Sequence, residues 1–511
     1  MIENITIKTA LLSVSDKSEL KKLAAALVAH NVELYSTGGT EKYLRENGFV
    51  VKSISELTNF PEMMDGRVKT LHPTVHGGLL FRRDIGEHVI QAKEHQIKAI
   101  DLLVVNLYPF EETVAKGGST HEDIIENIDI GGPAMLRSAA KNYDGVALLT
   151  HPSQYYEFIE EFNQSNGLIS HATRLKLAGA AFENVARYDK AIADYFSNNK
   201  RISLRYGENP HQTASVIGTS LDNFYHQLWG KELSYNNYLD SSASLSLISE
   251  FVDSDKAVVG IIKHTNPCGM AEGNNVIEAF EKAFATDTES PFGGVLVMNK
   301  ECSEALAVRI NEFFSEVILA PSYHEKALEL LKKKKDRRLL TYDLAELKKQ
   351  TVIGKDIRSI IGGILEQDRD NQLFINNDMK SVTVRPVSDI EREGLLFAWK
   401  ICKHVKSNAI VYVQSDNGFA HTIGIGCGQT SRVASSRLAV ANAKRFGHST
   451  KGSLVASDAF FPFADGLIEA ADAGAIAVIE PGGSVRDNEV IRAAQERNIS
   501  LIMTGMRHFK H

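Results

Sequence analysis

A lysine and a histidine stand side by side after an apolar run, in Ile261-Ile-Lys-His-Thr-Asn-Pro-Cys-Gly269. The preceding residues, 256–262, are rich in β-branched types and predict a buried strand. We expect Lys263 and His264 to reach the carboxyl edge of a sheet, on a turn fixed by Asn266-Pro267 and the following glycine. Imidazole can accept a proton near neutral pH, and an ammonium can stabilise developing negative charge. The alternative is a partly exposed histidine beside a solvated lysine.

A second candidate is the segment Ser36-Thr-Gly-Gly-Thr40, between a predicted strand and a predicted helix. Glycines let backbone N–H groups approach an anion, hydroxyls add donors, and a helix N-terminus adds positive potential. With Lys17 after the first strand, the segment predicts a phosphate cradle. A plain glycine turn with a threonine cap is the alternative. The chain contains no Walker A pattern, so a P-loop NTPase is not expected.

The loop 67–76 carries two cations and two imidazoles among glycine and proline, a mixture suited to binding phosphate or carboxamide. A zinc site formed by His72 and His76 is the rival. Pro73 interrupts the helical spacing, however, and no third ligand is evident.

Three ionisable residues fall at the ends of predicted elements. Tyr108 ends a buried strand, Asp129 stands at a glycine turn, and Lys141 follows about three helical turns later. Each alone could be structural, but their shared placement makes a site plausible.

The first 54 residues alternate between strand and helix patterns. Strands are expected over 9–14, 32–36 and 49–54, and helices from residue 20 and from residue 40 to about residue 48. Asp16 and Glu19 have the spacing of a capping box before the first helix. Right-handed crossovers would turn this βαβαβ unit into a doubly wound parallel sheet.

Polar and glycine-rich motifs continue in the second half of the chain. Residues 204–212 form a loop with many hydrogen-bonding side chains, and the fragment S-x-x-G-G-x-L, at 290–296 and 359–365, hints at two similar halves. Gly424-Ile-Gly-Cys-Gly428 fails the dinucleotide spacing, so we interpret it as a close backbone approach to a ligand, followed by Arg432 for phosphate. Asp458 precedes aromatic residues that could contact a flat heterocycle, with core packing as the alternative.

Composition excludes several classes of protein. The 511 residues are 43% hydrophobic and 24% charged, which is typical of a globular enzyme of about two to four domains. The formal net charge of −7 argues against bulk nucleic-acid or anionic-membrane binding. We find no apolar run of about 18 residues and no signal-peptide pattern, and the four scattered cysteines favour reduced thiols in the cytoplasm.

Eight motifs, in order and nearly end to end, resemble the bifunctional purine-biosynthesis enzymes that join AICAR transformylase to IMP cyclohydrolase. They are Ser13-Val-Ser-Asp-Lys17, Ser36-Thr-Gly-Gly-Thr40, Arg67-Val-Lys-Thr-Leu-His-Pro73, Asn106-Leu-Tyr-Pro-Phe110, Ile128-Asp-Ile-Gly-Gly132, Arg205-Tyr-Gly-Glu-Asn-Pro-His211, Lys263-His-Thr-Asn-Pro267 and Ser457-Asp-Ala-Phe-Phe-Pro-Phe463.

The resemblance implies an α/β fold with a domain like methylglyoxal synthase over 1–197. It also implies two cytidine-deaminase-like subdomains over 198–511, split near 360–390. The activities implied are formyl transfer from 10-formyltetrahydrofolate to AICAR and dehydrative closure of formyl-AICAR to IMP. A homodimer with the transformylase site at its interface is implied, as is a structural potassium ion without a catalytic metal. Zinc-deaminase chemistry is not expected, because no second cysteine follows Pro267-Cys268 in the required pattern.

The resemblance also assigns residues to each site. For ring closure it implies a proton-transfer pair of Asp129 and Lys141, with Lys69 and Tyr108 near the reacting groups. Substrate would be held by Ser13, Ser15, Lys17, Ser36, Thr37, Gly38, Gly39, Thr40, Arg67 and Thr70. For formyl transfer it implies His264 as base and Lys263 as its cationic partner. Substrate-binding residues there would be Arg205, Tyr206, Gly293, Glu316, Asn408, Arg432, Asp458, Glu480, Pro481 and Arg507.

Two other classes of protein remain open on the residues alone. A nucleotide sensor would keep the phosphate cradle without needing the four ionisable residues of the ring-closure site. A different amide or formyl transferase would be separated by its binding to folate resin and by competition with AICAR.

Overall fold

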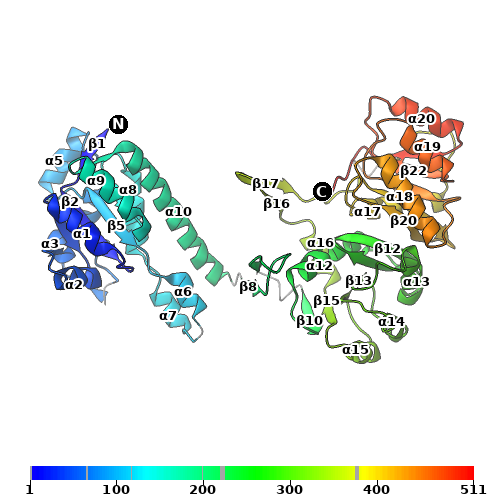
Figure 1. Cartoon of the computed structure of the whole chain (residues 1–511), viewed down its shortest axis with the longest axis horizontal. Helices are drawn as coiled ribbons and strands as arrows, with labels where there is room; N and C mark the ends of the chain where they lie inside the picture. Colours follow the sequence, from blue (N-terminus) through cyan, green and yellow to red (C-terminus); the bar gives the residue numbers. More distant parts are fainter. Residues whose placement is uncertain (1–2, 65–66, 117, 198–199, 219–224, 375–378) are drawn as a thin grey trace. The chain divides into compact units, whose positions relative to one another are not determined.

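The computed structural model describes residues 3–64, 67–116, 118–197, 200–218, 225–374 and 379–511 (Figure 1). The chain divides into two compact units, Met1–Lys200 and Arg201–His511. The sequence places this boundary between residues 197 and 198, within a predicted linker whose residues 198 and 199 lie outside the described part. No helix of the described residues is both long and apolar enough to cross a membrane.

The N-terminal unit is built on a parallel sheet in the order β4-β3-β2-β5-β6. Its strands are β2 (Thr9–Val14), β3 (Glu33–Ser36), β4 (Lys52–Ser53), β5 (Leu102–Asn106) and β6 (Ala147–Leu149). Its helices are α1 (Leu20–Ala29), α2 (Gly38–Glu46), α3 (Ile54–Thr58), α4 (Pro73–Leu80), α5 (Gly86–Glu94), α6 (Phe110–Ala115), α7 (His121–Glu126), α8 (Gly131–Lys141), α9 (Tyr155–Gln164) and α10 (His171–Phe196). β1 (Asn4–Thr6) and β7 (Leu168–Ser170) form a separate antiparallel pair. The doubly wound parallel sheet is confirmed.

Two local predictions in this unit are wrong. The expected strand over 49–54 shrinks to the two residues of β4, because Ser53 forms a capping box with Glu56 and starts α3. The expected capping box before α1 is absent: Asp16 accepts the Ser18 N–H at 2.8 Å, and Glu19 stands at the N-cap in a left-handed conformation. An Asx-type turn therefore replaces the cap.

The C-terminal unit contains a 12-stranded sheet in the order β10-β15-β14-β13-β11-β12-β20-β19-β21-β22-β23-β18. Its strands are β10 (His226–Trp229), β11 (Ala257–Lys263), β12 (Asn266–Gly273), β13 (Val295–Met298), β14 (Val317–Ala320), β15 (Arg338–Thr341), β18 (Lys380–Ser381), β19 (Ile410–Asp416), β20 (Phe419–Gly426), β21 (Leu454–Ser457), β22 (Ala477–Glu480) and β23 (Ser500–Met503). The helices are α12 (Tyr235–Ile248), α13 (Val276–Thr286), α14 (Glu304–Ile310), α15 (Glu325–Leu331), α16 (Leu344–Gln350), α17 (Asp389–Cys402), α18 (Arg432–Arg445), α19 (Asp465–Asp472) and α20 (Asp487–Glu496). β8 (Lys200–Leu204) pairs with β9 (Ala214–Gly218), and β16 (Lys355–Ile360) with β17 (Gly363–Asp368).

This sheet repeats one pattern twice. In each half an antiparallel hairpin, β11–β12 or β19–β20, precedes three strands that run parallel to one another. β12 and β20 join the halves at the bridge between Ala271 and His421. The S-x-x-G-G-x-L fragments are not the repeat, because one leads into β13 and the other lies in the β16–β17 hairpin.

Alternate residues of these strands enter different cores. Val258 packs with residues of α12 and α17, whereas its neighbour Val259 packs with those of α13 to α15. Helices α18 to α20 cover the second half in the same way. The period of two in a strand thus gives three layers, with the sheet in the middle.

Two glycines of the 424–428 motif, Gly424 and Gly426, serve packing between a strand and a helix. A Cβ on Gly424 would lie 2.3 Å from the Ala439 carbonyl oxygen, and one on Gly426 would lie 1.8 Å from that of Ser435. Both contacts are with α18 backbone, which cannot move aside as a flexible side chain could. At Gly424 and Gly426 the close approach is therefore to a helix and not to a ligand, whereas a Cβ on Gly428 would meet open space.

Candidate active sites

A cavity of about 610 Å³ opens at the carboxyl ends of β2 and β5, beside the N-termini of α2 and α8. Eleven of the residues predicted for ring closure line it. They are Ser13, Ser15, Lys17, Thr37, Gly39, Thr40, Arg67, Lys69, Thr70, Tyr108 and Asp129. Loops from distant parts of the sequence meet here because parallel strands all end at the same edge of the sheet.

The N-terminus of α2 forms one wall of this cavity. Thr37 is the N-cap residue, but its side chain makes no cap bond and instead meets the Ser13 hydroxyl at 2.8 Å. The Thr40 hydroxyl is engaged with the Val14 backbone, which ties the helix to β2. This leaves the first N–H groups of α2 without a side-chain cap, an arrangement suited to an anion.

Two residues of the predicted cradle do not line the cavity. The Ser36 side chain is buried and donates to the Leu12 carbonyl at 2.8 Å, so it joins strands. Gly38 adopts a φ of +40°, and a Cβ there would lie 3.9 Å from the Lys69 ammonium. Gly38 therefore serves the start of α2 through its positive φ and does not itself line the cavity.

Asp129 is a half-buried acid that lines the cavity. One of its carboxylate oxygens accepts the Gly132 N–H at 2.8 Å, and its own N–H donates to the Tyr188 hydroxyl at 2.7 Å. Burial raises the pKa of the Asp129 carboxyl, opposed by the Gly132 N–H and by the Lys69 charge. A carboxylate whose pKa is raised is a stronger base than an ordinary one, which suits it to accept a proton from a substrate.

The glycine turn after Asp129 has a steric reason. A Cβ on Gly131 would lie 2.3 Å from the Thr70 hydroxyl oxygen, and one on Gly132 would lie 2.4 Å from an Asp129 carboxylate oxygen. The two glycines thus let α8 begin directly against the cavity floor.

The structure does not bring Lys141 to the cavity. It is the last residue of α8 and is exposed, whereas Gly131 and Gly132 at the other end line the cavity. At about 1.5 Å per residue, the helix separates the two ends by about 15 Å. The nearby cation is Lys69, which lies 3.7 Å from a Glu62 carboxylate oxygen.

The remaining residues of the loop 67–76 divide between the cavity and the scaffold. Arg67 lines the cavity and forms an ion pair with Glu126, which also lines it. His72 caps α4 by accepting the Thr74 N–H at 3.2 Å. His76 meets the Ser138 hydroxyl at 2.9 Å. Within the described ranges no group of three or more His, Cys, Asp or Glu side chains could hold a metal.

The second candidate site is the tip of the β11–β12 hairpin. Lys263 pairs with Asn266, so the turn consists of His264 and Thr265, with φ of 51° and 64°. The predicted turn at 266–269 is wrong, because these residues continue as β12. The Lys263 ammonium donates to the Phe292 carbonyl at 2.9 Å, next to Gly293. Lys263 and the exposed His264 line a cavity of about 260 Å³.

Several predicted residues of the second half surround α18. The Asn408 side chain donates to the Gln429 carbonyl at 2.8 Å, and Arg432 is the first residue of α18. Both Arg432 and Arg507 lie over the Phe509 ring, at 5.7 and 4.8 Å.

Two further predicted residues, Asp458 and Glu480, are completely buried. The Arg432 guanidinium is 3.8 Å from Asp458, and Glu480 accepts the Phe461 N–H at 2.7 Å beside Pro481. Burial raises the pKa of Asp458, and it raises that of Glu480 to about 8. The Asp458 side chain is therefore placed to support Arg432, whereas the Glu480 side chain holds the Phe461 backbone.

A hydrogen bond connects the residue after the histidine turn to the second half of the C-terminal unit. The Asn266 side chain accepts the Lys406 N–H at 2.9 Å, two residues before Asn408.

Arg205 pairs with Tyr206 at 2.8 Å and does not line the cavity of Lys263. Glu316 is held by Asn237 at 3.1 Å and Arg338 at 3.2 Å. The predicted residues thus form several groups instead of one closed pocket.

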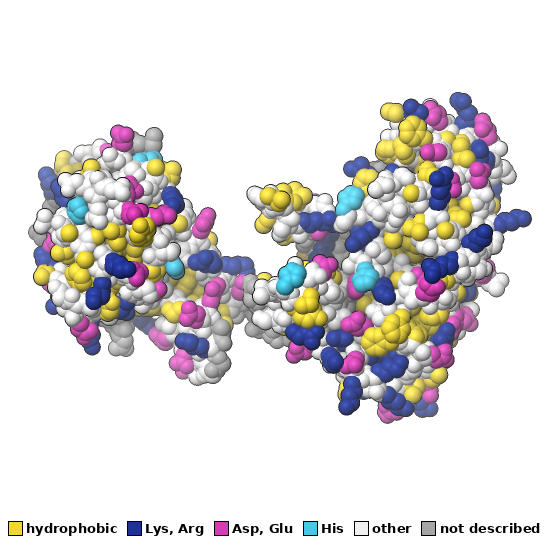
Figure 2. Space-filling view, in the orientation of Figure 1, with side chains coloured by type: hydrophobic (Ala, Val, Ile, Leu, Met, Phe, Trp, Pro, Cys, Tyr) yellow, Lys and Arg dark blue, Asp and Glu magenta, His cyan; other side chains and the backbone are white. Residues whose placement is uncertain are grey.

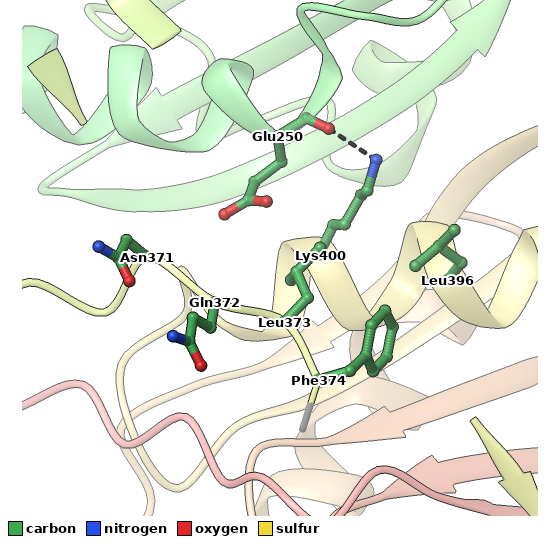
Figure 3. Close-up of a pocket in the computed structure, with 7 residues that line it drawn as sticks. All are labelled: Glu250, Asn371, Gln372, Leu373, Phe374, Leu396 and Lys400. Carbon is green, nitrogen blue, oxygen red and sulfur yellow. Dashed lines mark hydrogen bonds between the residues drawn. The ribbon is translucent and has the colours of Figure 1, made fainter. Parts of the chain in front are cut away.

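Another hollow of the C-terminal unit, of about 480 Å³, is lined by none of the predicted residues. Figure 3 shows Lys400 donating to the Glu250 carbonyl, at 2.6 Å, beside the side chains of Asn371 and Gln372. The Glu250 carboxylate meets Lys403 and His404 at 2.9 and 3.1 Å. Its partners tie α17 to the segment after α12, which is a structural role.

Sequence reasoning missed two polar side chains that line the first cavity, those of Asn106 and Glu126. Asn106 ends β5 and accepts the Asp16 N–H at 3.1 Å. Its place in the Asn-Leu-Tyr-Pro-Phe motif was a usable signal. No local pattern pointed to Glu126, because its pairing with Arg67 joins residues far apart in the chain.

Two family models and several curated proteins match this chain. The family model described as "AICARFT/IMPCHase bienzyme" matches residues 139–442, and that described as "MGS-like domain" matches residues 19–134. The chain is 50% identical to the "Bifunctional purine biosynthesis protein PurH" of Chlorobium phaeobacteroides strain BS1, over 99% of both chains. It is 49% identical to the protein of that name from Chlorobium chlorochromatii, again over 99% of each.

The chain belongs to the AICARFT/IMPCHase bienzyme family. It is a bifunctional enzyme that catalyses the last two steps of purine biosynthesis to IMP, so the sensor alternative is wrong. The first unit contains the MGS-like domain, which matches residues 19–134. The cytidine-deaminase-like description of the second unit stays a prediction.

Proposed function

We propose that the cavity of the N-terminal unit closes formyl-AICAR to IMP, and that Lys263 and His264 act in formyl transfer to AICAR. The observation that carries the first assignment is one cavity that joins an uncapped helix N-terminus to a half-buried acid and a lysine. Such a cavity suits a phosphorylated substrate whose other end must exchange protons.

In ring closure the carboxamide nitrogen attacks the formyl carbon of the same molecule. Holding the two groups in a reactive conformation accounts for much of the rate. Asp129 takes the proton from the attacking nitrogen. Lys69 stabilises the formyl oxygen, which leaves as water with that proton and with the one that the formyl-bearing nitrogen gives up. Tyr108, Thr70 and Arg67 border the substrate. We assign the proton-transfer role of Lys141 to Lys69, because Lys69 shares the cavity with Asp129.

Lys17 offers a direct test of the phosphate cradle. Lys17→Ala should raise the KM for formyl-AICAR about 10-fold, with kcat within about threefold, because a charge-assisted contact to phosphate supports substrate and transition state alike. Steady-state kinetics of ring closure measure both constants. Lys21→Ala, an exposed lysine of α1, is the matched control. An unchanged KM in Lys17→Ala would contradict the cradle.

In formyl transfer the AICAR 5-amino group is a weak nucleophile, since its lone pair delocalises into the ring and carboxamide. His264 removes its proton as nitrogen attacks the formyl carbon of 10-formyltetrahydrofolate. Lys263 stabilises the oxyanion and helps protonate the departing folate nitrogen. The name of the family, AICARFT/IMPCHase bienzyme, supports AICAR as the acceptor of the formyl group.

The other predicted residues fall into supporting roles. Arg205, Tyr206, Asn408, Arg432 and Arg507 would bind AICAR and its phosphate, with Gly293 and Glu316 beside the lysine. The Glu480-Pro481 turn would lie along the folate through its backbone. Because both side chains are buried, we assign Asp458 to holding Arg432 and Glu480 to holding the Phe461 backbone.

We also propose a cytoplasmic homodimer with a structural potassium ion. The β16–β17 hairpin supports the dimer, because Ile357, Ile360, Ile361, Ile364 and Leu365 are all exposed on it. Figure 2 shows these apolar side chains gathered on the hairpin. One Asp458 oxygen, buried without a hydrogen-bond partner in the described residues, is a ligand that potassium could take.

Sedimentation in potassium and in choline buffers tests the assembly. We expect a species of twice the chain mass of 56.3 kDa in potassium, because pairing would cover the apolar hairpin. Loss of that species in choline would support a structural ion. A single-chain mass in both buffers would contradict the dimer.

A further inference from the structure

The turn that carries His264 has a backbone conformation that its own residues disfavour. Two-residue hairpin turns with positive φ at both positions favour asparagine and glycine. Here the positions hold a histidine and a β-branched threonine, at φ 51° and 64°. Positive φ is strained for such side chains, and it persists only where the surroundings fix it.

The fixing contact comes from α12. Asp240, on that helix, accepts the Thr265 N–H at 2.7 Å, a bond across 25 residues of sequence. Within the turn, Asn266 and the Thr265 hydroxyl both donate to the His264 carbonyl, at 3.2 and 2.7 Å. Asp240 is thus the contact from outside the hairpin that holds the N–H of the turn itself.

Charged groups surround the Asp240 carboxylate that accepts the Thr265 N–H. His264 and Glu316 both act on its carboxylate electrostatically, with opposite effects on its pKa, and Glu316 is paired with Arg338 at 3.2 Å. Burial raises the pKa of the Asp240 carboxyl, opposed by its bond to the Thr265 N–H. A carboxylate that accepts a backbone N–H makes one of the stronger hydrogen bonds in proteins.

We propose that Asp240 is a positioning residue for formyl transfer, which holds the 264–265 turn through the Thr265 N–H so that His264 meets the AICAR amino group. The inference rests on the proposed role of His264. Asp240 itself touches no reacting atom. Its effect is therefore expected on the rate of the chemical step and not on the binding of AICAR.

Three variants test the proposal in the full-length enzyme. Asp240→Ala should lower kcat for formyl transfer about 100-fold, as expected for a catalytic group displaced by about 1 Å, with the KM for AICAR within about threefold. Asp240→Asn keeps an oxygen that can accept the Thr265 N–H and should recover kcat to within about fivefold of wild type. Asp253→Ala removes an exposed acid paired with Lys348 and should leave formyl transfer unchanged.

Ring closure is the internal control, because its cavity lies in the other unit. If Asp240→Ala fails to fold, Asp240→Ser is read in the same way, since its hydroxyl is too short to reach the Thr265 N–H. Wild-type kcat in the alanine or serine variant would overturn the proposal. So would equal losses in Asp240→Ala and Asp240→Asn, which would assign the effect to charge. Wild-type formyl transfer by His264→Ala would instead contradict the proposed role of His264 as the base, on which this inference rests.

Discussion

His264→Ala is expected to lower kcat for formyl transfer by about 10² to 10⁴-fold, the usual contribution of a positioned general base. The AICAR amino group is too weak a nucleophile to attack without losing its proton. His264 is exposed at a turn beside the Lys263 ammonium, so its imidazole is accessible to substrate. Ring closure of added formyl-AICAR should keep its wild-type rate.

The measurement is the release of tetrahydrofolate at saturating AICAR. His324→Ala is the matched control, because His324 is an exposed histidine of the same unit that makes no cap bond to α15. It should retain full activity. Formyl transfer within about threefold of wild type in His264→Ala would show that another group, or water, takes the proton.

Lys69→Ala and Asp129→Asn should each lower kcat for ring closure by about 10² to 10⁴-fold and leave formyl transfer intact. Asp129 is half-buried and lines the cavity, and an amide there removes the proton acceptor without a large change of shape. Formyl-AICAR is then expected to accumulate. Its conversion to IMP, followed by absorbance, measures the loss.

Lys141→Ala provides the comparison for Lys69→Ala. The family resemblance implies a catalytic Lys141, whereas the structure places it at the far, exposed end of α8. We expect Lys141→Ala to close the ring at a rate within about threefold of wild type. If the two variants lost activity equally, Lys141 would have to reach the cavity in a conformation different from this one.

The fold could be predicted wherever a local pattern decides it. The alternation of strand and helix over the first 50 residues gave β2, α1, β3 and α2 to within about two residues. The short β4 could not be predicted, because the side chain of Ser53 starts a helix within an apolar strand pattern. The repeat of the C-terminal unit is topological, so fragments of seven residues pointed to the wrong segments.

The first site was predictable to a larger extent than the second. Its motifs follow parallel strands or begin helices, and one sheet edge gathers them without any long-range knowledge. The turn at His264 depends instead on Asp240 from α12, and the glycines 424 and 426 depend on the approach of α18. Contacts between elements distant in sequence leave no local pattern. Family resemblance alone could not show that Lys141 lies away from Asp129.

Product identification by mass spectrometry tests the division of labour between the two units most directly. AICAR and 10-formyltetrahydrofolate are supplied to His264→Ala, to Lys69→Ala, and to both variants mixed. We predict unchanged AICAR with the first, formyl-AICAR with the second, and IMP with the mixture, because each variant retains the site that the other lacks. IMP from His264→Ala alone, or no formyl-AICAR from Lys69→Ala, would contradict the assignment of one reaction to each site.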